Sequence, residues 1–114
     1  MNRKSVLVVD DEADIRELLV LTLSRMGVDA DTASTFSEAE EALKVRPYDL
    51  CLTDMRLPDG DGMQVLRHIA ENYGNTPVAV ITAFGSTENA VAALKAVLPP
   101  FAVTFAVLPA VPLV

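Results

Sequence analysis

The sequence predicts an α/β fold in three layers, with a parallel β-sheet between two layers of helices. Short, continuously apolar segments alternate with longer segments whose apolar residues recur at helical spacing. Strands that are apolar along their whole length are typical of parallel sheets covered on both faces, and their alternation with helices is typical of βαβ units. The length of 114 residues fits one domain with a single core.

The first half of the chain is predicted to form three strands and two helices. We expect strands at residues 6–9, 28–33 and 48–53, and helices at residues 12–26 and 36–45. The first helix has an apolar stripe formed by Ile15, Leu18, Leu19 and Leu23. Gly27 is expected to end this helix, and Thr35 with Glu38 forms a capping-box pattern that begins the next one.

The second half continues the alternation. We expect a turn-rich loop at residues 57–62, a helix at 63–73, a strand at 77–81, a loop at 82–86 and a helix at 87–97. Asp59 and Asp61 are expected to be turn formers, and His68 is expected to face solvent. Ser86 or Thr87 is expected to cap the last helix.

The end of the chain has a different composition. Residues 96–114 contain no charged side chain, and four prolines there make a membrane-spanning helix improbable: Pro99, Pro100, Pro109 and Pro112. We therefore divide the chain into a domain at residues 1–96 and an atypical apolar, proline-rich tail at 97–114.

The composition excludes some classes of partner and location. The net charge of −7 argues against direct contact with nucleic acid, because phosphate binding requires basic patches. Cys51 is the sole cysteine, so no disulfide can form within the chain, and a cytoplasmic location is expected. The apolar run before Asp10 is too short for a secretory signal, so none is expected there.

Aspartates follow two of the predicted strands. Asp10 and Asp11 come after the first strand, and Asp54 comes after the third. Because the carboxyl ends of parallel strands meet at one edge of a sheet, these carboxylates are expected to converge in one crevice together with Thr82. Close like charges imply a bound divalent cation, a raised pKa, or both.

This arrangement suits phosphoryl transfer to a carboxylate. Asp54 is the expected nucleophile, which would form an acyl phosphate. Asp11, with Asp10, is expected to hold Mg²⁺, which would neutralise the carboxylates and the phosphoryl oxygens. The Thr82 hydroxyl can donate a hydrogen bond to the phosphoryl group. Two further site residues are expected: Ala83, whose small side chain keeps the crevice open, and Arg56, whose backbone carbonyl can bind the metal.

Three short motifs resemble the receiver domain of bacterial two-component response regulators. They are VVDDE at residues 8–12, DMRLPDGDG at 54–62 and ITA at 81–83, and the resemblance covers residues 4–96. Within that family the chain is similar to the nitrogen-regulator and type IV pilus regulator group of sigma-54-dependent activators. The resemblance implies a flavodoxin-like α/β/α sandwich with strand order 2-1-3-4-5. The tail stands where the family has its fifth strand and fifth helix. The sequence therefore does not decide whether a fifth strand forms, and no fifth helix is expected.

The resemblance also implies a signalling function. Asp54 would accept a phosphoryl group from a histidine kinase, Thr82 would be the switch hydroxyl, and Phe101 would be the switch aromatic. The domain would be a signalling switch with no turnover activity. Its output would act through a transcription-activating region outside this chain, with a homodimer formed through the face of the fourth helix and fifth strand. Neither nucleic acid nor a membrane is an expected partner of this segment.

The family's lysine at the end of the fifth strand has no equivalent here. The matching position is Thr104 without a gap, or Leu108 with a four-residue insertion, and neither carries a charge. The tail has three open explanations: a shifted reading frame or sequence error, an incorrectly assigned segment, or natural divergence with altered switching. If the tail is a natural divergence, a second function is an alternative, that of a degenerate receiver acting in dimerisation or docking. A Mg²⁺-dependent aspartyl-phosphate phosphohydrolase is less consistent with the sequence, because Arg56 stands where such enzymes place a second acid.

Overall fold

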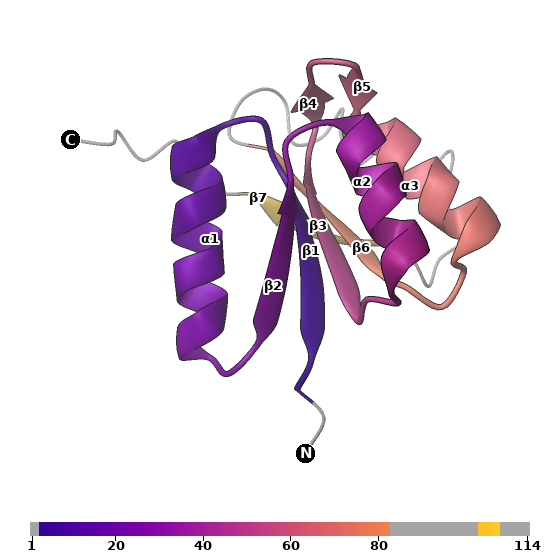
Figure 1. Cartoon of the computed structure of the whole chain (residues 1–114). Helices are drawn as coiled ribbons and strands as arrows, with labels where there is room; N and C mark the ends of the chain where they lie inside the picture. The colour runs from indigo at the N-terminus through magenta and orange to yellow at the C-terminus, as the bar shows by residue number, and fades with distance from the viewer. Residues whose placement is uncertain (1–2, 83–102, 108–114) are drawn as a thin grey trace.

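The computed structural model describes residues 3–82 and 103–107 (Figure 1). Its elements are β1 (Ser5–Val9), α1 (Ala13–Arg25), β2 (Asp29–Ala33), α2 (Phe36–Val45), β3 (Leu50–Asp54), β4 (Arg56–Leu57), β5 (Gly60–Asp61), α3 (Gly62–Asn72), β6 (Val78–Thr82) and β7 (Val103–Val107). The strands and helices predicted up to residue 82 are confirmed, with small shifts at their ends. The predicted helix at 87–97 and its cap at Ser86 or Thr87 lie outside the described residues.

Five parallel strands form the central sheet. Their order is β2-β1-β3-β6-β7, which confirms the predicted order 2-1-3-4-5. The fifth strand, left open by the sequence, is β7, and Val107 pairs with Thr82 at its end. Part of the apolar tail therefore completes the edge of the sheet. The short strands β4 and β5 form a separate antiparallel hairpin, which the sequence did not predict.

Helices lie on both faces of the sheet. In Figure 1, α2 and α3 cover one face and α1 lies against the other. The tightly packed core lies under α2 and α3 and contains Leu7, Val9, Cys51, Val78 and Val80 of the sheet with Ala39, Leu43, Val65, Leu66 and Ile69 of the two helices. The helix residues recur at helical spacing and the sheet residues at alternate positions, as expected for two packed amphipathic surfaces.

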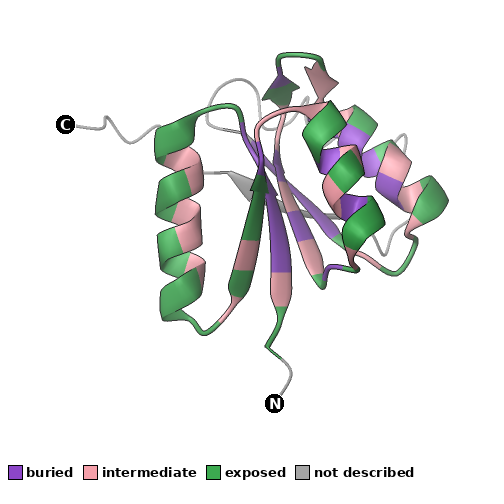
Figure 2. Ribbon diagram, in the orientation of Figure 1, coloured by how far each residue is buried: buried purple, intermediate pink, exposed green. Residues whose placement is uncertain are grey.

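The helix α1 packs less deeply than the sequence suggested. None of its residues is buried (Figure 2). Leu18 is 53% exposed. Ile15, Leu19 and Leu23 are half-buried. Leu18 is therefore the exposed member of the predicted apolar stripe, and the half-buried part of α1 is narrower than the apolar pattern.

The ends of the helices follow local sequence signals. Gly27 follows α1 with a φ of 77°, a left-handed conformation that favours glycine. The Thr35 side chain accepts a hydrogen bond from the Glu38 N–H at 3.0 Å and caps α2. Among the described residues, no helix is both long enough and apolar enough to cross a membrane.

Candidate functional site

Three aspartates converge where β1 and β3 end. These strands are parallel neighbours with Val9 opposite Thr53, so Asp10 and Asp54 emerge side by side at one edge of the sheet. One carboxylate oxygen from each of Asp10, Asp11 and Asp54 lies within 4.8 Å of the others. Asp10 is buried, Asp54 is half-buried and Asp11 is exposed, so the cluster extends from the protein interior to the solvent.

Asp10 is held rigidly at the base of the cluster. Its carboxylate accepts the Glu12 N–H at 2.9 Å, its carbonyl accepts the Arg16 side chain at 2.7 Å, and its N–H donates to the Ala33 carbonyl at 3.0 Å. Burial raises the pKa of Asp10 to about 6, and the nearby charge of Asp54 adds to this effect. The bond from Glu12 opposes the shift without cancelling it.

Asp54 has a different balance of effects. Burial raises its pKa above the ordinary value, and the charges of Asp11 and Glu12 act in the same direction. The N–H groups of Met55 and Arg56 lower the pKa and so favour the ionised carboxylate. The Asp54 carboxylate therefore faces the N–H groups of its own loop, and Asp54 is half-buried whereas Asp10 is buried.

The cluster fits a small, hard divalent cation. All of its donors are oxygens, which are the ligands that Mg²⁺ prefers. Two of its carboxyl groups, Asp10 and Asp54, have a raised pKa, mainly because burial disfavours the charged form and also because neighbouring carboxylates repel it. A bound cation would supply positive charge that offsets this repulsion.

The loop after Asp54 folds back tightly on the strand. The Gly62 N–H donates to the Met55 carbonyl at 2.8 Å, and β4 pairs with β5 between these two residues. A Cβ atom at Gly62 would lie 2.6 Å from the Asp54 carbonyl oxygen, so only glycine fits there without a shift of backbone. Arg56, at the start of β4, is exposed and two residues from Asp54.

The remaining predicted site residues are only partly placed. Thr82 is the last residue of β6, one position beyond the pairing of Ile81 with Asp54. Ala83 and Phe101 lie outside the described residues. Thr104 lies inside β7 opposite Ala79, whereas Leu108 comes directly after β7 in the sequence. The end of β7 therefore corresponds to the alignment that includes the four-residue insertion. The residue at that position, Leu108, is uncharged.

Two aspartates of the loop do more than form a turn. The Asp59 carboxylate accepts the N–H groups of Phe36 and Ser37 at 2.8 and 3.0 Å, at the start of α2. Asp61 and Gln64 form a reciprocal capping box at the start of α3. The Asp61 role was visible in the sequence as an acid three residues before a glutamine, but no local signal links Asp59 to a helix 22 residues away.

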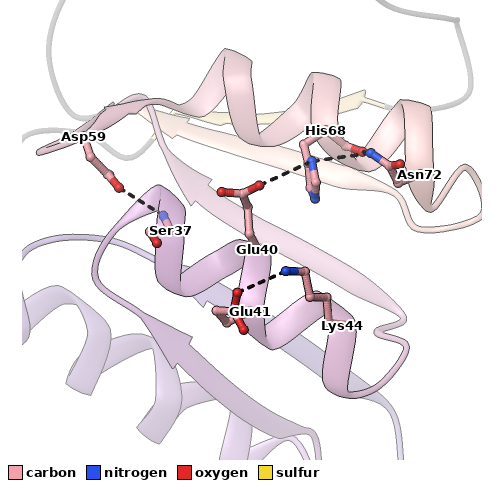
Figure 3. A network of polar contacts seen from close by, with 7 residues as sticks. All are labelled: Ser37, Glu40, Glu41, Lys44, Asp59, His68 and Asn72. Carbon is pink, nitrogen blue, oxygen red and sulfur yellow. Dashed lines mark hydrogen bonds and ion pairs between the residues drawn. The ribbon is translucent and has the colours of Figure 1, made fainter.

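His68 also differs from its expectation. Its side chain is 23% exposed and its ring packs edge-on against Phe36 of α2, with centroids 5.9 Å apart. Its Nδ1 lies 4.0 Å from the Glu40 carboxylate (Figure 3). The prediction that it faces solvent is therefore wrong, because α2 lies close enough to α3 to cover most of the side chain.

Comparisons with known proteins agree with this geometry. The response regulator receiver domain family matches residues 6–99. The chain is 54% identical over 96 residues to the response regulator protein PilR of Pseudomonas aeruginosa, covering 84% of this chain and 22% of that protein. It is 36% identical over 95 residues to the DNA-binding transcriptional regulator NtrC of Escherichia coli K12, covering 83% and 20%. The chain thus spans about a fifth of the length of these relatives.

Solved structures give the same result. A response regulator receiver domain protein from Clostridium thermocellum superimposes with a TM-score of 0.74 at 30% identity, covering 82% of this chain and 76% of that one. The response regulator TrrA from Thermotoga maritima, in complex with Mg²⁺ and beryllofluoride, gives a TM-score of 0.69 at 35% identity, covering 72% and 71%. With its parallel sheet and its cluster of strand-end aspartates, the chain belongs to the receiver domain family of two-component response regulators.

Proposed function

We propose that Asp54 is the residue of this receiver domain that accepts a phosphoryl group from a histidine kinase. The single observation that carries this proposal is the convergence of Asp10, Asp11 and Asp54 at the ends of two neighbouring strands. Asp54 is the better nucleophile because it is half-buried, whereas Asp10 is 5% exposed and bound to the Glu12 N–H. Substrate can therefore approach Asp54.

The transfer uses an oxygen of the Asp54 carboxylate. This oxygen attacks the phosphorus of a phosphohistidine, an O–P bond forms as the N–P bond breaks, and the imidazole nitrogen keeps the electron pair. Bound by Asp10, Asp11, Asp54 and the backbone carbonyl of Arg56, Mg²⁺ would supply charge that offsets the carboxylates and the phosphoryl oxygens. The Met55 and Arg56 N–H groups favour the ionised form of the Asp54 carboxylate, which is the form that attacks, and so oppose the rise in its pKa caused by burial.

The same proposal includes the output of the domain. The Thr82 hydroxyl, at the end of β6, would donate to the phosphoryl oxygen and so report that Asp54 is occupied. The domain would act as a switch with slow dephosphorylation and no turnover of external substrates, in the cytoplasm. Its homodimer would form beside β7, which is an edge strand of the sheet. A transcription-activating region beyond this chain would receive the signal.

Acetyl phosphate tests the proposal without the kinase. We expect Mg²⁺-dependent addition of one phosphoryl group per chain, measured by intact mass spectrometry. The label should disappear in Asp54→Asn and should form much more slowly in Asp11→Asn, which keeps the nucleophile but loses a metal ligand. Labelling that persists in Asp54→Asn would refute the assignment, and rapid multiple turnover of phosphate esters would indicate a phosphohydrolase instead.

One observation favours a second candidate function, that of a degenerate receiver used for docking or dimerisation. No lysine follows Lys95 in the chain, and the residue directly after β7 is the uncharged Leu108. A receiver without a cation at this position has less charge to stabilise the phosphoryl group. Beryllofluoride, a phosphoryl mimic, separates the two candidates: binding in the presence of Mg²⁺ supports the switch, and a lack of binding supports docking.

A further inference from the structure

The first turn of α2 is capped by a residue from a distant part of the chain. The Asp59 carboxylate accepts the N–H groups of both Phe36 and Ser37, and Figure 3 shows it reaching across to Ser37. The next N–H, that of Glu38, goes to the Thr35 side chain. Because N–H groups at a helix start carry partial positive charge, a carboxylate with two such bonds is held strongly.

Asp59 lies at the tip of the loop that follows Asp54. The bond from Gly62 N–H to the Met55 carbonyl closes this loop at its base, and the pairing of Arg56 with Asp61 and Leu57 with Gly60 keeps its two arms together. A closed two-stranded hairpin moves largely as one unit. Fixing its tip therefore also restricts Met55 and Arg56 at its base.

The start of α2 is tied to the other half of the acidic cluster as well. The Ala33 carbonyl, at the end of β2, accepts the Asp10 N–H at 3.0 Å. Residues 33–37 thus contact both chain segments that carry the carboxylates. Hydrogen bonds at the two ends of this segment, joined by its covalent backbone, therefore connect Asp10 with Asp59 and the hairpin.

We infer that Asp59 is a positioning residue for the metal site, which holds the hairpin against α2 and so sets the place of the Arg56 backbone relative to Asp10 and Asp11. The inference rests on the proposed function, in which the Arg56 carbonyl binds Mg²⁺. The two N–H bonds also lower the pKa of Asp59, so its carboxylate stays ionised at neutral pH. The bridge is therefore in place under the conditions in which the domain would bind metal.

The competing explanation is that Asp59 only stabilises α2. Thr35→Ala is the matched control, because it removes a cap from the same helix turn and leaves the hairpin and Asp59 unchanged. Asp59→Asn removes one acceptor oxygen and Asp59→Ala removes both. A positioning role predicts an effect on metal affinity that is graded from wild type through Asn to Ala and is absent in Thr35→Ala.

Metal affinity is measured by titrating Mg²⁺ into the ¹⁵N-labelled chain and following amide chemical shifts, with folding of each variant verified by circular dichroism. We expect Asp59→Ala to weaken Mg²⁺ binding about tenfold, as removal of groups that orient metal ligands usually does. Asp59→Asn should show a smaller loss of Mg²⁺ affinity. If Asp59→Ala does not fold, the comparison of Asp59→Asn with Thr35→Ala decides the question. Thr35→Ala should bind Mg²⁺ like wild type.

The outcomes separate this inference from the proposed function. Wild-type affinity in Asp59→Ala or Asp59→Asn, or an equal loss in Thr35→Ala, would overturn the positioning role. Normal Mg²⁺ binding by wild type without any phosphoryl label on Asp54 would overturn the phosphoacceptor role alone. A wild-type chain that binds no Mg²⁺ would overturn both.

Discussion

At the residue scale, Asp10 makes the metal-free domain sensitive to pH. Its pKa is about 6 in the folded protein and 3.8 in the ordinary carboxyl group, so the folded state holds the proton more tightly. Stability is therefore gained when Asp10 is protonated, and it is lost as the pH rises from about 4 through about 6. The loss at pH 7 is on the order of 2 kcal/mol after allowance for screening by solvent.

Asp10→Asn tests this directly. Asparagine keeps the oxygen that accepts the Glu12 N–H but carries no charge. We expect the variant to be more stable than wild type at pH 7 without Mg²⁺, by on the order of 2 kcal/mol, with the difference shrinking as the pH falls towards 4. Urea unfolding at several pH values measures it. A variant that is less stable than wild type at pH 7 would contradict the raised pKa.

The acid cluster was predictable from the sequence for a physical reason. Asp10, Asp11 and Asp54 follow buried parallel strands, and such strands end at one edge of a sheet. The contact between Asp59 and α2 was not predictable in this way, since it joins residues 22 and 23 positions apart that have no shared periodic pattern. Side-chain details of a site therefore depend on loop packing that the sequence pattern does not encode.

At the element scale, α3 begins against the backbone of Asp54. Gly62→Ala would place a Cβ atom 2.6 Å from the Asp54 carbonyl oxygen and 3.2 Å from the Met55 Cα, and backbone atoms cannot move aside easily. We expect it to lower the free energy of unfolding by about 1–3 kcal/mol, the usual cost of overpacking. Urea denaturation measures this loss.

Gly74→Ala is the control for this substitution. A Cβ atom at Gly74 would have its nearest neighbour at 3.7 Å, an ordinary contact. Its effect should stay within about 0.5 kcal/mol, as for most surface substitutions. Equal stability of the two variants would show that the start of α3 can move away from Asp54.

The elements differ in how well the sequence encodes them. Gly27 and Thr35 marked helix boundaries correctly, because the left-handed glycine and the side-chain cap are local devices. The sequence does not predict the hairpin of β4 and β5, since strands of two residues have no measurable period. The sequence does not locate β7, because apart from Thr104 the tail around it is apolar and no alternation marks where a strand begins.

At the scale of the whole molecule, the thiol of Cys51 in the central strand β3 can be used to measure global unfolding. Cys51 is fully buried in β3, between β1 and β6, and burial raises its pKa to about 12. Thiol reagents need an accessible thiolate. We expect the native protein to react with a disulfide reagent at least about a thousandfold more slowly than the unfolded chain, because only the small unfolded fraction at equilibrium exposes the thiol.

The urea dependence identifies the opening that exposes this thiol. If global unfolding is required, the reaction rate should rise with urea as steeply as the unfolding equilibrium does. A rate that does not change with urea below the transition would indicate a local opening of the sheet, and it would contradict the picture of one cooperative core around β3.

Within residues 3–82, the two faces of the sheet contribute unequally to that core, and paired substitutions measure the difference. Leu66 of α3 is fully buried, whereas Leu18 of α1 is 53% exposed. Leu66→Ala leaves a cavity among well-packed side chains and should cost about 2–5 kcal/mol. Leu18→Ala removes a side chain that already contacts water and should cost less than about 0.5 kcal/mol. Equal losses in urea unfolding would mean that Leu18 is covered in solution, by self-association or by another part of the chain. Repeating the measurement at several protein concentrations separates these cases, because only self-association makes the stability depend on concentration.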